Sequence, residues 1–432
     1  AQQTRTAMKT DDAFSEFIDN LAIKNRDEIV RRRDEITRVL NQEFRSLDDS
    51  THYQMMVGSF GRYTAINGIS DLDMLYILPP SLWSSYNKDT GPESALSRVR
   101  QALKTRYPRT DIKVNQCIVS IQFTNFRFEL QPVFENGDES FKYPDTYSNN
   151  WKTTKPREEI KEISSTDSVT HGNLRNLCKM VRAWRNKHGV AMGGLLIDTL
   201  VYNFLQSTCD YRSSSISSYG QMVRDFFNYL SKEPYKEHYL AVGSRQHVRV
   251  KKNFQRKAKQ ACNICDEALQ AEGSSNAISK WKELFGRPFP AKSRKRDNLS
   301  YNNTEEFIED SYPIDIRNTV TIKCKVTQDG FMPRQLGDML IKHIPLLPKK
   351  TLDFTITSCD VTNQYEVRWK VLNRGDEAER RNEIRGQIIK PNKGNGRRET
   401  TRFRGDHYVE CYVLDNGVVV ARDRIDVPIS SS

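Results

Sequence analysis

The sequence lacks a long apolar segment. No run in the 432 residues approaches the roughly eighteen consecutive apolar residues of a membrane-spanning helix. The first residues also carry no apolar stretch of the kind found in secretory signals. We therefore expect a protein that neither crosses a membrane nor is secreted, and we predict a cytoplasmic location.

Cysteine and histidine are too sparse or too scattered for a disulfide or zinc scaffold. The eight cysteines lie mostly in apolar or helical contexts, whereas small disulfide-stabilised domains concentrate theirs. Cys262 and Cys265 form a lone C-x-x-C, which is two ligands short of a structural zinc site. We expect reduced thiols with packing roles.

Positive charge, in contrast, is abundant. The formal net charge of +12 favours polyanionic partners such as nucleotides or nucleic acid. Seven Lys and Arg residues and no acid fall within 245–259. That run contains only one aromatic residue, Phe254, so recognition by base stacking is poorly supported. We interpret it as a solvated or nucleotide-steering surface, and a nucleic-acid partner stays open.

The apolar periodicity changes along the chain and predicts the domain order. Residues 134–170 are expected to be rich in loops, and Trp369 is expected in the core of a C-terminal β-sandwich built from six or seven short strands. The expected parts are a core with N-terminal helices at 11–170, a helical lobe at 171–286, a linker at 287–311 and the sandwich at 312–432.

The chemistry of the sequence is concentrated between Met56 and Pro80. Gly58 and Ser59 open a short turn, and Asp71 and Asp73 follow in a segment that is typical of a strand. Side chains alternate along a strand, so both aspartates point to the same face. Neighbouring carboxylates repel each other unless a cation lies between them. A D-x-D pair alone is most often a solvated strand end, so further evidence is needed.

Glu129 supplies a third acid on a later strand. It shares one strand face with Arg127 and Gln131. Three converging carboxylates hold two metal ions about 4 Å apart in phosphoryl-transfer enzymes, and Mg²⁺ prefers such oxygen ligands. We therefore predict that Asp71, Asp73 and Glu129 are catalytic and bind two Mg²⁺ ions, with Mn²⁺ as an alternative.

Four short motifs together resemble those of the polymerase-β-like nucleotidyltransferases, and in particular the bacterial cGAS/DncV-like nucleotidyltransferases (CD-NTases, SMODS type). The motifs in this sequence are Gly58-Ser59, Thr64-Ala65-Ile66, Ser70-Asp71-Leu72-Asp73 and Glu129-Leu130-Gln131-Pro132. The resemblance implies an α+β fold with a polymerase-β-like core and a helical second lobe. The third acid is Glu where the family more often has Asp.

The resemblance also implies which residues bind the nucleotide. Gly58 and Ser59 are expected to contact the triphosphate of the donor. A basic residue on the second-lobe helix is expected to do the same, with Arg182 as the closest match by spacing and Lys179 one turn earlier as the second choice. Tyr202 is a candidate for stacking on a base, although a core tyrosine is an equally good interpretation.

The C-terminal part resembles the adenylyl/guanylyl cyclase and SMODS C-terminal sensor domain (AGS-C), which implies an immunoglobulin-like sandwich. The matching stretches are 365–369, 373–378, 385–386, 399–400 and 404–408. Their Arg, Gly and His residues at strand ends either contact a ligand or regulatory partner or fix the turns.

Taken together, the resemblance implies a cyclic oligonucleotide synthase that uses NTPs such as ATP or GTP and releases pyrophosphate. Its product would be a cyclic di- or trinucleotide second messenger in antiphage (CBASS) defence. Two alternatives stay open. One is a nucleotidyltransferase acting on RNA ends or on a small molecule, and the other is a non-catalytic nucleotide sensor.

Overall fold

The computed structural model describes residues 8–291 and 302–431. Internal packing divides the chain into two compact units. Unit 1 comprises Ala1–Trp184 and Met192–Ala291, and unit 2 comprises Arg185–Ala191 and Lys292–Ser432. The predicted linker at 287–311 falls partly on residues 292–301, which lie outside the described residues.

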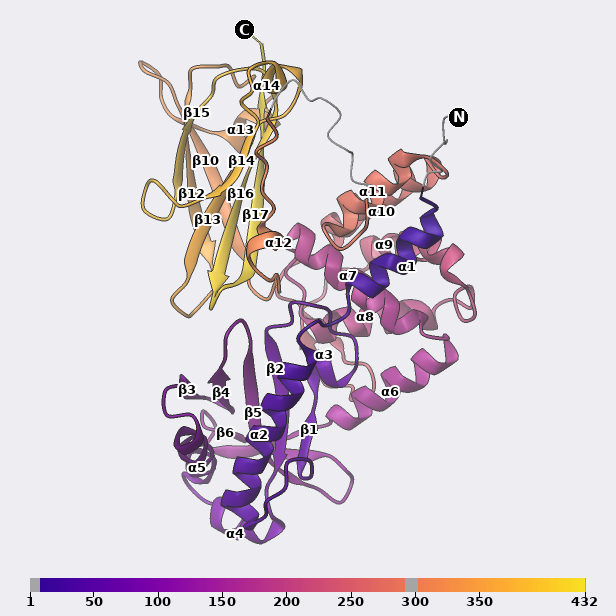
Figure 1. Cartoon of the computed structure of the whole chain (residues 1–432), viewed down its shortest axis with the longest axis vertical. Helices are drawn as coiled ribbons and strands as arrows, with labels where there is room; N and C mark the ends of the chain where they lie inside the picture. Colours follow the sequence, from indigo (N-terminus) through magenta and orange to yellow (C-terminus); the bar gives the residue numbers. More distant parts are fainter. Residues whose placement is uncertain (1–7, 292–301, 432) are drawn as a thin grey trace, which may run out of the picture. The chain divides into compact units, whose positions relative to one another are not determined.

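A seven-stranded mixed sheet forms the first half of unit 1 (Figure 1). Its main path runs β1-β2-β5-β4-β3, and β6 and β7 extend it from β5. Only β2 and β5 run parallel; the other pairs are antiparallel. The strands are β1 Gln54–Met56, β2 Asp71–Ile77, β3 Ile112–Asn115, β4 Ile118–Gln122, β5 Arg127–Glu135, β6 Phe141–Asp145 and β7 Asn150–Thr154.

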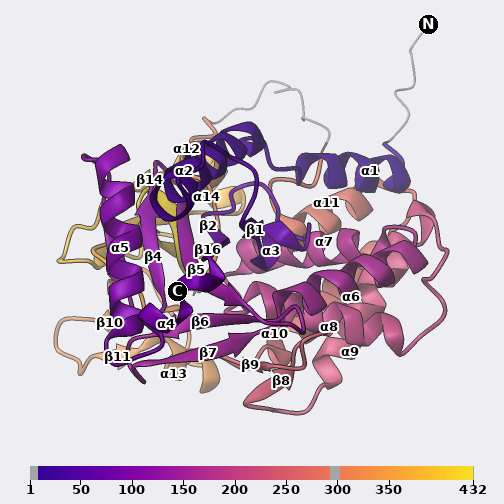
Figure 2. The same cartoon turned by 90° about the horizontal axis from the view of Figure 1, so that it is seen from below.

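Two long helices, α2 (Arg26–Arg45) and α5 (Gly91–Arg106), pack with this sheet and share its apolar core (Figure 2). Alternation places Leu72, Met74 and Tyr76 of β2 in that core, fully buried. The Tyr76 hydroxyl donates to the carbonyl oxygen of Leu40 in α2 at 3.1 Å. The inward face of β2 is therefore fixed by packing, which leaves Asp71 and Asp73 on the opposite face.

The second half of unit 1 is mainly helical. Helix α1 belongs to it by packing: Phe14 and Phe17 form an aromatic cluster with Trp281, Phe285 and Phe289. The helices are α1 Thr10–Asn20, α6 Pro156–Val169, α7 Asn173–His188, α8 Gly194–Gln206, α9 Tyr219–Lys232, α10 Gln255–Gln270 and α11 Ser275–Phe285. A small hairpin joins them, formed by β8 His238–Leu240 and β9 His247–Arg249.

The expectation that 134–170 is rich in loops is wrong. The segment contains β6, β7 and helix α6. The start of α6 carries two ordinary helix signals, because Pro156 stands at the first helical position and Glu158 and Glu159 lie in the first turn. Strands β6 and β7 are each five residues long and gain their stability from pairing with each other and with β5.

Unit 2 contains two four-stranded antiparallel sheets that share one core. Their orders are β11-β10-β12-β15 and β14-β13-β16-β17. Trp369 is fully buried, as predicted, with Phe354 of the other sheet at 6.2 Å between ring centroids. The strands are β10 Val320–Thr327, β11 Arg334–Gln335, β12 Thr351–Cys359, β13 Glu366–Leu372, β14 Arg385–Ile389, β15 Arg397–Thr400, β16 Gly405–Asp415 and β17 Val418–Ile429. The described part of this unit has eight strands where six or seven were predicted, and the two shortest, β11 and β15, contain only polar residues.

Candidate active site

The structure brings the three predicted acids together. The parallel register of β2 and β5 pairs Asp73 with Glu129 and pairs Asp71 with Arg127. Asp73 and Glu129 are therefore direct cross-strand neighbours, and Asp71 lies two residues along on the same face. Nothing in the local sequence shows this pairing, because the two strands are separated by a helix and a hairpin.

The carboxylates of this group repel one another. Burial, together with the charges of Glu129 and Asp71, raises the pKa of Asp73 to about 7. The Arg127 guanidinium lies between the acids, with its Nε 2.9 Å from Asp71 Oδ1 and 3.3 Å from Glu129 Oε1. The sequence analysis placed Arg127 on the same face as Glu129 without assigning it a role. It is the counter-charge of the acidic group.

The three acidic side chains are chemically suited to bind a divalent cation. All three side chains offer carboxylate oxygens, the ligands that Mg²⁺ and Mn²⁺ take, and their mutual repulsion is the kind that a bound cation relieves. Among the described residues, no set of three or more acidic, His or Cys side chains is already spaced to chelate a metal.

The turn before β2 lies directly against Asp73. Gly58 has φ +62°, and a Cβ at this position would stand 2.0 Å from Asp73 Oδ2. Only glycine satisfies both the backbone angle and the close approach. The backbone N–H of Val57 donates to the Asp73 carbonyl at 2.9 Å, and the N–H groups of Thr64 and Ala65 donate to the Ser59 carbonyl. The predicted Gly58-Ser59 turn is thus held beside the acids.

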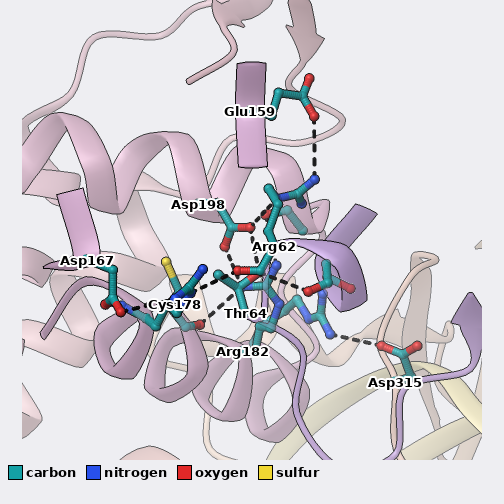
Figure 3. Close-up of polar contacts among 12 residues, drawn as sticks. Arg62, Thr64, Glu159, Asp167, Cys178, Arg182, Asp198 and Asp315 are labelled. Atoms are coloured by element: carbon teal, nitrogen blue, oxygen red, sulfur yellow. Dashed lines mark hydrogen bonds and ion pairs between the residues drawn. The ribbon is translucent and has the colours of Figure 1, made fainter. Parts of the chain in front are cut away.

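A buried ion cluster supports this turn from the helical half of unit 1 (Figure 3). Asp198 of α8 is fully buried and accepts hydrogen bonds from Arg62 Nε at 2.8 Å, Thr64 Oγ1 at 2.7 Å and Arg182 Nη1 at 2.6 Å. Burial alone would raise the pKa of Asp198, but the charges of Arg182 and Arg62 hold it well below its usual range. Arg62 also lies 3.6 Å from Glu159 of α6. Sequence reasoning missed both Arg62 and Asp198.

The predicted basic residues of α7 differ in their surroundings. Arg182 is buried, and besides Asp198 it donates from Nη2 to the Gly194 carbonyl at 3.1 Å. A Cβ on Gly194 would lie 2.9 Å from Arg182 Nη2 and 3.8 Å from Ser59 Cβ, so Arg182 is near the turn while its charge is matched by Asp198. Lys179 is half-buried, and its pKa is lowered by burial and by the charge of Arg175.

Tyr202 projects from α8 and is half-buried. Its hydroxyl donates to Glu162 Oε1 of α6 at 2.9 Å, and burial and this hydrogen bond raise the pKa of Tyr202. The contact ties α8 to α6 and leaves the stacking role of the ring a prediction.

Acids on adjacent strands beside a glycine-serine turn are the arrangement of a nucleotidyltransferase, and comparisons with known families agree. Residues 8–166 match the Second Messenger Oligonucleotide or Dinucleotide Synthetase (SMODS) domain, and residues 302–430 match the Adenylyl/Guanylyl and SMODS C-terminal sensor domain. The chain therefore belongs to the bacterial cGAS/DncV-like nucleotidyltransferases with a C-terminal AGS-C domain, which confirms the predicted family. No curated protein matches the chain.

Several solved structures are similar in fold to part of the chain. CdnC of E. coli MS115-1 with ATP shows 15% identity over 65% of this chain and 98% of its own, with a TM-score of 0.48. The Vibrio cholerae cyclic AMP-GMP synthase DncV, in complex with the linear intermediate 5′ pppA(3′,5′)pG, shows 15% identity over 65% and 87%, with a TM-score of 0.45. The STING-associated CdnE c-di-GMP synthase of Capnocytophaga granulosa shows 15% identity over 60% and 84%, also at 0.45.

Within residues 8–291 and 302–431, no helix is both long enough and apolar enough to cross a membrane.

Proposed function

We propose that this protein synthesises a cyclic oligonucleotide by transferring nucleotidyl groups from NTPs, ATP or GTP in the first instance, to ribose hydroxyls with release of pyrophosphate. The product would be a cyclic di- or trinucleotide second messenger in antiphage (CBASS) defence. The supporting observation is the register of Asp73 with Glu129, with Gly58 packed on Asp73. The proposal includes a polymerase-β-like core and an immunoglobulin-like type for the sandwich.

In the proposed mechanism, Asp71, Asp73 and Glu129 hold two Mg²⁺ ions, or Mn²⁺ in their place. When bound, these ions neutralise the triphosphate and lower the pKa of the attacking hydroxyl. Gly58 lets the backbone approach the donor phosphates, and the Ser59 hydroxyl binds them. Glu129 lies beside the acceptor hydroxyl and favours the loss of its proton.

In this proposal, the two basic residues of α7 have different roles. Lys179 binds the triphosphate, because its side chain is only half-buried and its ammonium forms no ion pair among the described residues. Arg182 positions the Ser59 turn through Asp198 and Gly194. Tyr202 stacks on a base. This assignment reverses the order that spacing alone suggested for the two basic residues.

Incubation with mixed NTPs and no added acceptor tests the proposal. A phosphatase-resistant product identified by mass spectrometry supports self-cyclisation, and product only in the presence of an RNA or small-molecule acceptor supports the alternative transferase. Absence of pyrophosphate release under all conditions would point to a non-catalytic sensor.

The double variant Asp71→Asn/Asp73→Asn is expected to make no product while keeping the wild-type circular dichroism spectrum. The matched control is Asp111→Asn, since the exposed Asp111 carboxylate pairs with the exposed Lys113 at 2.7 Å. Product formation by the double variant at the wild-type rate would overturn the mechanism.

A further inference from the structure

The two sheets of unit 2 leave a cavity between two of their edge strands. Strand β14 is an edge of one sheet and β15 an edge of the other, and both line a cavity of about 470 Å³. Small-molecule sites in proteins occupy roughly 300 to 1,000 Å³. Apolar side chains from both sheets, among them Phe354 of β12 and Val371 of β13, line it together with polar ones. We call this cavity the edge cleft.

Charged side chains span the rim of the edge cleft. Arg385 of β14 binds Glu399 of β15 in a bidentate pair, at 2.7 Å and 3.1 Å. Arg397 donates to the same carboxylate at 2.7 Å. Burial would raise the pKa of Glu399, but Arg385 and then Arg397 lower it. Two guanidinium groups therefore share one carboxylate, which leaves donor capacity for a further acceptor.

The backbone at Arg385 has an unusual conformation. Arg385 has φ +58° and the next residue, Gly386, has φ +89°. A Cβ on Gly386 would stand 2.8 Å from Leu372 Cδ1 and 3.0 Å from Glu305 Cα. The register of β14 with β13 shifts at this point, as at a β-bulge. Bulges and left-handed non-glycine residues concentrate where a side chain must be re-aimed for binding.

A second cavity of about 860 Å³ shares Arg402 and Phe403 with the edge cleft. Its charged lining consists of four arginines and three acids, namely Arg374, Arg381, Arg402, Arg404, Asp376, Glu377 and Asp406. Two of the arginines stack on aromatic rings: Arg381 lies 5.2 Å from the Phe403 centroid, and Arg374 lies 4.6 Å from that of Tyr408. Arg381 also pairs with Glu377, and Arg374 donates from Nε to the Asp406 carbonyl at 3.1 Å, so these two guanidinium groups offer only their remaining donors to a phosphate.

His407 holds the loop that carries Arg402 and Arg404. Its Nδ1 accepts from the Arg374 N–H at 2.9 Å, so Nε2 carries the proton and donates to the Phe403 carbonyl at 3.1 Å. A Cβ on Gly405 would stand 2.5 Å from His407 Cε1, so glycine is required for the close packing. His407 and Gly405 therefore fix the turn, and the arginines beside them face the second cavity.

We propose that the edge cleft and the adjoining cavity bind a nucleotide, with the base in the cleft and the phosphate on Arg402 and Arg404. A flat heteroaromatic ring bears donors and acceptors on its rim and apolar faces. It matches a lining that combines apolar side chains with Glu399, Arg385 and the Gln387 amide. A phosphate matches the arginine-lined second cavity. A bare anion would make no contact with the apolar side chains of the cleft. An apolar ligand would cover the arginines without offering them a hydrogen-bond acceptor.

The test uses hydrogen–deuterium exchange of the full-length chain in EDTA with AMP, GMP, CMP and UMP at millimolar concentration. At least one nucleotide is expected to protect residues 385–389 and 397–409. Exchange reports these segments separately from the active-site turn at 58–73, so nucleotide bound at the catalytic site is not mistaken for nucleotide in the cleft. Absence of protection there with all four nucleotides overturns the proposal, as does equal protection by inorganic phosphate.

Variants separate the two halves of the site. Arg402→Gln/Arg404→Gln is expected to weaken nucleotide binding about tenfold or more, because charge-assisted bidentate bonds to phosphate are lost, and to leave binding of the matching nucleoside unchanged. Gln387→Ala is expected to weaken both. The control Arg334→Gln lies on β11, the opposite edge of the sheet that contains β15, and should change neither. Nucleotide protection that persists unchanged in the first two variants contradicts the proposal.

Discussion

The Arg182 guanidinium and the Asp198 carboxylate form a buried ion pair of 2.6 Å that joins α7 to α8. Both side chains are at most 2% exposed. Because Thr64 and Arg62 bind the same carboxylate, the pair also anchors the turn that carries Ser59. A basic residue expected to bind substrate is thereby part of the framework of the site.

This cluster predicts a large loss of stability in Asp198→Ala. Removal of one partner leaves Arg62 and Arg182 buried without their shared counter-charge, which typically costs about 3–5 kcal/mol of unfolding free energy. Urea denaturation followed by circular dichroism measures the loss. The control Asp266→Ala removes the partly exposed pair with Arg224 and should cost at most about 1 kcal/mol. Equal losses in the two variants would contradict the framework role.

The packing of Gly58 on Asp73 predicts that Gly58→Ala disables catalysis. A methyl group would collide with the Asp73 carboxylate and would hold a strained backbone at φ +62°. We expect at least about a hundredfold fall in kcat with substrate present, because a displacement of an active-site group by about 1 Å costs this much. Steady-state pyrophosphate release measures it.

Gly193→Ala is the matched control for Gly58→Ala. Gly58 is the first residue of the short helix α3 (Gly58–Gly61), and Gly193 directly precedes α8, but a Cβ on Gly193 meets nothing within 4 Å. Wild-type turnover is expected in this variant. Similar losses in the two glycine variants would show that the effect is not specific to the contact with Asp73.

The position of Arg127 predicts that its removal increases the stabilisation of the protein by divalent cations. In Arg127→Ala the three acids lose the guanidinium between them, so the repulsion within the group grows. We expect a lower Tm without metal and a larger rise of Tm on addition of MnCl₂ than in the wild type, since a ligand of the folded state stabilises it. Differential scanning fluorimetry measures both.

Arg157→Ala is the control for that experiment, because Arg157 pairs with Glu135 of β5 beyond the acidic group. Its response to MnCl₂ should equal that of the wild type. An equal response of Arg127→Ala and the wild type would refute this prediction.

A buried pair in unit 2 predicts how stability changes with pH. The charge of Arg422, followed by that of Lys187, outweighs burial and lowers the pKa of Glu410 to about 2. In the unfolded chain this carboxyl titrates near its ordinary value of about 4.3. The stabilisation is therefore complete above about pH 4.3 and is lost as pH falls toward 2.

Urea midpoints between pH 3 and pH 6, roughly the window in which the unfolded carboxyl titrates, measure this effect. The wild type should lose more stability on acidification than Glu410→Gln, which cannot titrate at this position. Parallel pH profiles of the two proteins would show that Glu410 does not carry the dependence.

The sequence by itself determined the local features of the catalytic site. Strand alternation placed Asp71 and Asp73 on one face, and Glu129 on one face with Arg127, because side-chain direction in a strand follows from a period of two. The Gly-Ser turn, the break before α8 and most strands of the sandwich were also predictable, since they depend on residues close in the sequence. The motifs then identified the family.

Only the tertiary structure decided which of these residues meet. The pairing of β2 with β5 places Glu129 beside Asp73 and Arg127 between the acids. The fold also brings Asp198 to Arg182, the residue expected to bind phosphate, so that a buried carboxylate matches its charge. Such contacts join residues from different helices and strands, so they depend on how those elements pack. They also depend on the free-energy cost of burying charged groups, which a local sequence pattern does not show.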